Sequence, residues 1–167
     1  MPLYPVVAVC AAAFIWLSGR ALPERVAAHF DAAGAVNGYL PRGPYLIATI
    51  VLAVVLPLLL VTVSQVGVGR PGARINLPNR DYWLAPERRD ATIQYLRNWM
   101  ARFAMLLALL VCFVHWLVVR ANAMPASPHL SNSAFYGALV VFGTLMVLWI
   151  RGLFVRFRLP LTRQRKT

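Results

Sequence analysis

Three histidines and one aspartate are the strongest candidates in this chain for metal binding or proton exchange. His29 and Asp31 lie close together in one polar stretch, His129 lies in a second polar stretch, and His115 lies in an apolar segment. Imidazole and carboxylate groups can bind a transition metal or exchange protons near neutral pH. The spacing of these histidines matches no recognised ligand motif, so they are only weak metal candidates. We expect instead that the His29 ring holds a turn at Asn37-Gly38 and that His115 hydrogen-bonds a neighbouring helix.

The sequence nominates no catalytic site. It contains no HExxH pattern, no glycine-rich phosphate loop, no paired acids and no serine near a base in sequence. The apolar segments contain no carboxylate, which argues against the proton relay of a pump. Cys10 and Cys112 fall within apolar segments, and we expect them to pack rather than to form a disulfide or a zinc site. The sequence therefore predicts a protein that is not an enzyme and that needs no cofactor.

The composition predicts that lipid surrounds most of the side chains. Of 167 residues, 60% are hydrophobic and 13% are charged, with a net charge of +12. Soluble domains average about 45–50% apolar and about 25% charged residues. A strongly basic chain could bind nucleic acid or an anionic membrane surface, and the apolar content favours the membrane. We expect one domain over residues 1–167, anionic lipid headgroups as partners, and no nucleic acid.

Four apolar segments are predicted to cross the bilayer as helices. They cover residues 3–18, 45–68, 103–119 and 134–154. A spanning helix needs about 20 apolar residues, with about 17 as the lower limit, so the first segment is marginal. A cleaved signal peptide is the alternative there, but no Lys or Arg precedes Arg20, which favours a retained helix. In the second segment Pro57 predicts a kink, because proline removes a backbone donor.

The segments between these helices differ in their positive charge. The central loop, residues 69–102, has seven basic residues, and the stretch from 151 to 166, which includes the tail at residues 155–167, has six. The connections at residues 19–44 and 120–133 have only four basic residues between them, Arg20, Arg25, Arg42 and Arg120. Short basic loops remain in the cytoplasm. We therefore expect cytoplasmic N- and C-termini and two outer loops.

The central loop is predicted to contain an amphipathic helix. Pro86 and Glu87 have the signature of a helix start, and apolar residues then recur at helical spacing as far as Phe103. We expect this helix to lie near the membrane surface and to run into the third span. The candidate residues of the loop are Asn76, Pro78, Tyr82, Trp83, Pro86, Glu87 and Arg88. The aromatic rings of Tyr82 and Trp83 suit the membrane interface, so we expect the loop to be anchored there. The alternative is that these residues form a docking surface for a partner protein.

The stretch from residue 22 to residue 39 resembles the DUF1648 family, a short bacterial membrane domain. The resemblance is carried by Leu22, Pro23, His29, Phe30, Asp31, Gly34, Asn37, Gly38 and Tyr39. Family members usually have proline where Ala27 stands and often have asparagine where Asp31 stands. The resemblance covers roughly residues 1–65, and residues 75–89 are similar to the following loop of longer members. Related domains occur in immunity proteins of the SdpI type, but nothing here resembles their additional helices.

These observations predict an all-α, four-helix transmembrane protein in which two helical hairpins flank a basic cytoplasmic loop with an amphipathic interfacial helix. The resemblance implies a location in the bacterial plasma membrane. We expect a non-catalytic binding, sensing or accessory role, with another membrane protein or a second copy of the chain as a partner. A small transporter or channel subunit, and an immunity or signalling component of the SdpI type, are the alternatives.

Overall fold

A computed structural model describes residues 3–70, 75–124 and 127–159. Its elements in chain order are α1 (Leu3–Gly19), β1 (Arg25–Phe30), β2 (Val36–Pro41), α2 (Arg42–Ile50), the π-helical turn η1 (Val51–Val55), α3 (Leu56–Gly69), α4 (Arg80–Trp83), α5 (Pro86–Asn122) and α6 (Asn132–Arg156).

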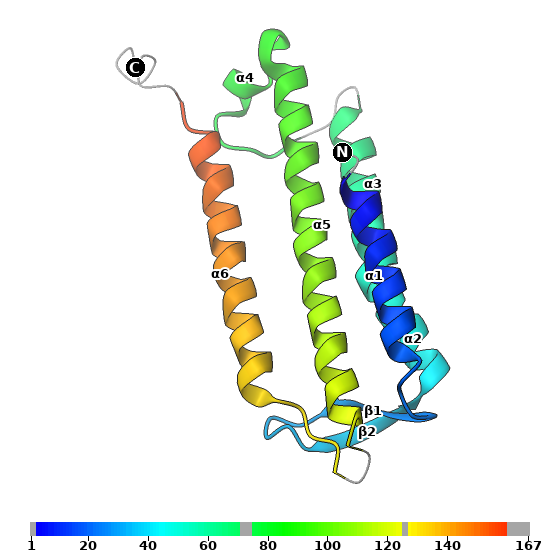
Figure 1. The fold of residues 1–167 in the computed structure, drawn as a ribbon. Helices are drawn as coiled ribbons and strands as arrows, with labels where there is room; N and C mark the ends of the chain where they lie inside the picture. Colours follow the sequence, from blue (N-terminus) through cyan, green and yellow to red (C-terminus); the bar gives the residue numbers. More distant parts are fainter. Residues whose placement is uncertain (1–2, 71–74, 125–126, 160–167) are drawn as a thin grey trace.

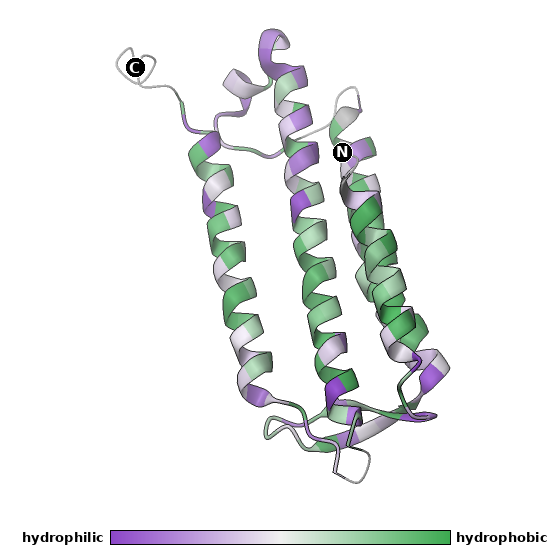
Figure 2. Cartoon of the chain, viewed as in Figure 1, coloured by the Kyte–Doolittle hydropathy of each residue, from purple (hydrophilic) through white to green (hydrophobic). Residues whose placement is uncertain are grey.

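The long helices run side by side, with α5 in contact with α1, α3 and α6 (Figure 1). One end of the bundle, here called the hairpin end, holds β1, β2 and the connection between α5 and α6. The other, called the basic end, holds α4, the start of α1 and the end of α6. Figure 2 shows apolar residues along the middle of the helices and hydrophilic residues at their ends, which is the distribution that a bilayer requires.

Three helices are long and apolar enough to cross a membrane. They are the continuous helix Arg42–Val68, formed by α2, η1 and most of α3, and the helices Pro86–Asn122 and Asn132–Arg156. The predicted first span is also helical and apolar, but it is a shorter helix of 17 residues. Spanning length is therefore confirmed for three of the four predicted segments.

The all-α prediction did not include the two strands of the connection at residues 19–44, which was expected to be an outer loop. There β1 and β2 form an antiparallel hairpin in which Ala27 pairs with Tyr39 and His29 with Gly38. Alanine-rich sequence has a low intrinsic preference for strands, but burial of Val26 and Ala27, both 0% exposed, stabilises the pairing. The predicted turn at Asn37-Gly38 is also wrong, because both residues lie within β2 and the chain reverses at residues 31–35.

The prediction that a helix beginning near Pro86 runs into the third span is confirmed. Helix α5 begins at Pro86 and continues without interruption to Asn122, over 37 residues. It is about 55 Å long, whereas the hydrocarbon core of a bilayer is about 30 Å thick. The helix is therefore longer than one crossing requires, and only the short α4 precedes it within the described part of the loop.

The distortion predicted at Pro57 takes the form of η1. Pro57 has no N–H to donate to the carbonyl group of Ala53, four residues earlier. The five residues just before Leu56 adopt a wider π-helical turn, and the helix then continues as α3. A single π turn of this type is a known cause of local distortion in an otherwise regular helix, and proline is another.

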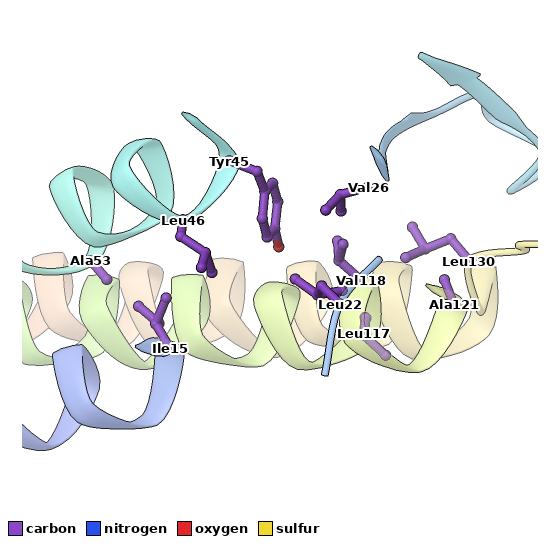
Figure 3. Close-up of a cluster of buried hydrophobic side chains, with 10 residues drawn as sticks. All are labelled: Ile15, Leu22, Val26, Tyr45, Leu46, Ala53, Leu117, Val118, Ala121 and Leu130. Atoms are coloured by element: carbon purple, nitrogen blue, oxygen red, sulfur yellow. The ribbon is translucent and has the colours of Figure 1, made fainter. Parts of the chain in front are cut away.

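The main buried cluster lies at the hairpin end, where α1, α2, α5 and the hairpin meet (Figure 3). Its members are Ile15, Leu22, Val26, Tyr45, Leu46, Ala53, Leu117, Val118, Ala121 and Leu130. A β-carbon added at Gly19 would collide with the Leu46 side chain, so α1 and α2 approach closely here. Helix α6 contributes no buried residue, and this cluster therefore positions the hairpin on α1, α2 and α5.

Candidate functional site

The turn of the hairpin is built around Asp31. Its Oδ1 accepts hydrogen bonds from the backbone N–H groups of Ala33 and Ala35, at 2.9 Å each. Its own N–H donates to the Ala35 carbonyl at 2.8 Å, and Gly34 donates to the Asp31 carbonyl at 3.0 Å. A short acidic side chain can satisfy nearby backbone donors in this way. Asp31 therefore fixes the shape of the turn.

Gly34 brings this turn against the connection that precedes α6. Its φ is +84°, and the N–H of Leu130 donates to its carbonyl at 2.9 Å. A β-carbon at Gly34 would lie 2.5 Å from the Leu130 oxygen and 2.7 Å from Asn132 Oδ1. Only glycine fits both the backbone conformation and the available space. The neighbouring Ala35 also forms a β-bridge with His129.

An amide side chain from α5 fastens β1 to the helices. Asn122 Oδ1 accepts from the Ala27 N–H at 2.9 Å, and its Nδ2 donates to the Ala27 carbonyl at 3.0 Å and to the Val118 carbonyl at 2.9 Å. Asn122 is only 5% exposed. It therefore pairs both backbone groups of Ala27 in a place where water does not reach them.

The first turns of α6 hold the other side of the hairpin. Asn132 Nδ2 donates to the Ala32 carbonyl at 3.0 Å, and the Tyr136 hydroxyl donates to the same oxygen at 3.4 Å. Together with Asn122, these bonds tie the hairpin to two helices that are far from it in sequence. The hairpin is therefore held as a fixed cover over the ends of α5 and α6.

A cleft of about 370 Å³ lies between the hairpin, α5 and α6. This volume is within the range of roughly 300–1,000 Å³ that small-molecule sites occupy. The hairpin and α6 supply its polar side chains, which are His29, Asp31, Asn37, Asn132 and Tyr136. Its apolar lining comes mainly from Val114 and Val118 of α5 and from Leu130 and Phe135. Convergent polar groups over an apolar floor make this cleft the candidate functional site.

His29, which the sequence analysis selected, lines this cleft and also supports the strand ladder. Its ring lies against Gly38, where a β-carbon would be 3.0 Å from His29 Nδ1. Within the motif, Phe30, Asp31 and Asn37 line the same cleft. By contrast Leu22 lies in the buried cluster, and Pro23 lies in the bend before β1 and is partly buried. The cleft-lining residues Asn132 and Tyr136, which the sequence analysis missed, come from α6.

His115 joins three helices in the interior of the bundle. Its Nε2 lies 3.0 Å from Ser18 Oγ on α1, and its Nδ1 lies 2.9 Å from the Tyr45 hydroxyl on α2. The Tyr45 and His115 rings are stacked with their centroids 5.7 Å apart, and His115 is 1% exposed. The predicted hydrogen bond between His115 and a neighbouring helix is therefore confirmed, with two partners that the sequence did not identify.

The three histidines lie in different surroundings. His115 is enclosed by Ser18, Tyr45 and Phe14, while His129 lies beside Gly34. His29 faces the cleft. Across residues 3–70, 75–124 and 127–159, no three histidine, cysteine, aspartate or glutamate side chains gather in a way that could hold a metal ion.

The aromatic residues of the central loop fasten α4 to the end of α6. Asn79 Nδ2 and Trp83 Nε1 both donate to the Phe157 carbonyl, at 2.8 and 3.0 Å, and the Phe157 side chain is fully buried. The Arg156 guanidinium lies 4.5 Å from the centroid of the Trp83 ring and 5.2 Å from that of Tyr95, in cation–π geometry. Trp83 therefore has a clear structural role at the basic end.

The remaining candidates of the central loop shape its path into α5. Arg88 Nε donates to the Tyr82 carbonyl at 2.9 Å, and its guanidinium lies 4.1 Å from the centroid of the Tyr82 ring. Pro86 and Glu87 form the first turn of α5, as their sequence signature predicts. Asn76 is exposed, and Pro78 lies in the turn before α4. None of these residues lines the cleft between the hairpin, α5 and α6.

The fold and the site together define a class of protein: a helical protein of membrane-spanning character with a small β-hairpin that covers one end of its helices. Residues 6–61 match the family model of DUF1648, a domain of unknown function, which confirms the resemblance seen in the sequence. The match covers most of α1, the hairpin, α2, η1 and the start of α3, and it ends before α5 and α6. Comparison with curated proteins and with solved structures gave no match. The second wall of the cleft therefore comes from helices outside the matched domain.

Proposed function

We propose that this protein is a non-catalytic binding protein of the membrane and that its ligand occupies the cleft. The observation that carries the proposal is the convergence of five polar side chains, from the hairpin and from α6, over an apolar floor provided by α5. The hydrogen bonds of Asp31, Asn122 and Asn132 fix the walls before any ligand binds. A site that is already ordered loses less entropy on binding.

The acidic and imidazole groups in the cleft also support the hairpin that forms its wall. Asp31 uses Oδ1 to hold two backbone N–H groups of the turn, and the His29 ring packs on Gly38. Both side chains therefore have architectural roles that restrict their movement.

We further propose that the cleft opens on the outer side of the bacterial plasma membrane, with both termini in the cytoplasm. Support comes from the arginines at the basic end, which can contact anionic headgroups. They are Arg70, Arg80, Arg88, Arg89, Arg97, Arg102, Arg151, Arg156 and Arg158.

A fluorescent protein fused after Lys166 is expected to fluoresce, and alkaline phosphatase fused there is expected to be inactive. Alkaline phosphatase fused after Ser127 is expected to be active, and the reverse pattern would exclude this orientation.

The proposed function predicts that a bulky residue in the floor of the cleft displaces a bound molecule. Val114 lines the cleft, so Val114→Trp is expected to fill it. Native mass spectrometry of protein extracted in a mild detergent should detect a small molecule on the parent and lose that signal with Val114→Trp.

The matched control is Val140→Trp, because Val140 is 69% exposed on α6 and does not line the cleft. This variant should retain the molecule in the same proportion as the parent. The proposal is wrong if the parent carries no molecule. It is also wrong if Val114→Trp and Val140→Trp carry equal amounts of the molecule and both elute from a size-exclusion column at the same volume as the parent.

A further inference from the structure

An apolar groove of about 410 Å³ runs between α5 and α6. Its walls include Leu106, Leu110 and Phe113 of α5 and Ala138, Val141 and Leu145 of α6. Every residue that lines it is apolar. The groove lies within helices of spanning length and composition, so hydrocarbon rather than water is the medium that would fill it.

The groove and the cleft follow each other along the same pair of helices. On α5, Leu110 lines the groove and Val114, four residues later, lines the cleft. On α6, Ala138 lines the groove and Phe135, three residues earlier, lines the cleft. Residues three or four positions apart share one face of a helix. The polar cleft and the apolar groove therefore lie one after the other on the same faces of α5 and α6.

The groove exists because α6 is attached mainly near its two ends. At the basic end, Trp149 stacks on Trp99 with centroids 5.1 Å apart, and Gly152 lies against Trp99. At the hairpin end, Asn132 and Tyr136 bind the turn. Between these attachments the side chains of α6 leave space beside α5. A hydrocarbon chain lying in this groove would make dispersion contacts with both walls.

The polar end favours a head that donates hydrogen bonds. No lysine or arginine is among the residues that line the cleft, whereas Asp31 brings a carboxylate to it. Recognition of phosphate or carboxylate groups usually uses arginine or lysine. The carboxylate of Asp31 and the amide oxygen of Asn37 instead suit hydroxyl or ammonium donors.

We propose that the cleft and the groove form one binding site for a lipid-like amphiphile. Its hydrocarbon chain lies between α5 and α6, and its uncharged or cationic head, with hydroxyl or amine donors, lies under the hairpin. This inference rests on the proposed function, which places a ligand in the cleft, and adds the chemical class of that ligand.

Two photoreactive probes with the same diazirine-labelled acyl chain test this inference. One is a monoacylglycerol, with a hydroxyl head, and the other is a lysophosphatidic acid, with an anionic head. The protein is placed in phosphatidylcholine nanodiscs, irradiated with each probe and mapped by peptide mass spectrometry. The monoacylglycerol is expected to label α5 and α6 around the groove about tenfold more strongly than the anionic probe does.

Neighbouring residues of α6 provide the matched variants. Ala138→Trp fills the groove and is expected to lower the labelling about tenfold. Gly137→Trp places the same side chain in open space, since nothing lies within 4 Å of a β-carbon there, and labelling is expected to persist. Asp31→Asn keeps an oxygen for the turn while removing the charge, and it is expected to reduce the preference for the hydroxyl head.

The outcomes separate this inference from the proposed function. If Val114→Trp displaces a small molecule but Ala138→Trp leaves the labelling unchanged, the ligand is confined to the cleft and the amphiphile inference is wrong. Equal labelling by both probes, or labelling spread evenly over all lipid-facing helices, also overturns it. Failure of the proposed function is recognised separately, by the absence of any molecule on the parent protein in native mass spectrometry.

Discussion

Replacing His115 by phenylalanine is expected to lower the melting temperature of the purified protein by roughly 4–10 °C. The variant keeps an aromatic ring for the stack with Tyr45, but it removes both hydrogen-bonding nitrogens. The Tyr45 hydroxyl then loses its hydrogen bond to His115 in a buried position, which costs about 2–3 kcal/mol together with the lost bond to Ser18. The measurement is a thermal unfolding scan in detergent, with intrinsic fluorescence as the signal.

Two tyrosine variants show whether the hydrogen bonds cause this change. Tyr45→Phe removes one of the two bonds of His115 and is expected to produce about half of the loss. Tyr39→Phe removes a hydroxyl from a residue that is 49% exposed on the hairpin, and it is expected to leave the melting temperature unchanged. A His115→Phe variant that melts with the parent would show that these contacts between α1, α2 and α5 contribute no net stability.

Replacing Asn122 by leucine is expected to release the hairpin from α5. Leucine has a similar size, but it leaves the N–H and the carbonyl of Ala27 unpaired, and Ala27 is 0% exposed. Two unsatisfied buried backbone groups cost roughly 2–5 kcal/mol. Hydrogen–deuterium exchange should therefore show loss of protection across residues 25–41, while the amides in the middle of α5 keep theirs.

The matched control carries the same substitution elsewhere on α5. The Asn98 side chain accepts a hydrogen bond from Gln94 at the exposed surface, so Asn98→Leu is expected to leave the hairpin protected. Since the hairpin forms one wall of the cleft, Asn122→Leu should also release any molecule bound there. Unchanged exchange in residues 25–41 would show that Asn122 does not hold the hairpin in place.

The sequence alone was sufficient for the elements that depend on length and composition. Apolar runs located all three helices of spanning length, because crossing a bilayer requires a continuous apolar stretch whatever its neighbours are. Asp31 and Gly34, which shape the hairpin turn, were selected as motif residues only through the family resemblance, and the turn itself was predicted at the wrong place, Asn37-Gly38. The continuity of α5 was predictable as well, because no glycine or proline follows Pro86 before Asn122.

Only the tertiary structure decided how these elements meet. Asn122 binds Ala27 across 95 positions, and Ser18 binds His115 across 97. Local periodicity predicts that a residue lies on a helix face, but it carries no information about which distant group that face meets. The strand at Ala27 has little intrinsic preference for its conformation and forms because β2 and Asn122 pair its backbone. The cleft likewise exists only where α6 folds back against the hairpin, since its two walls come from segments about a hundred residues apart.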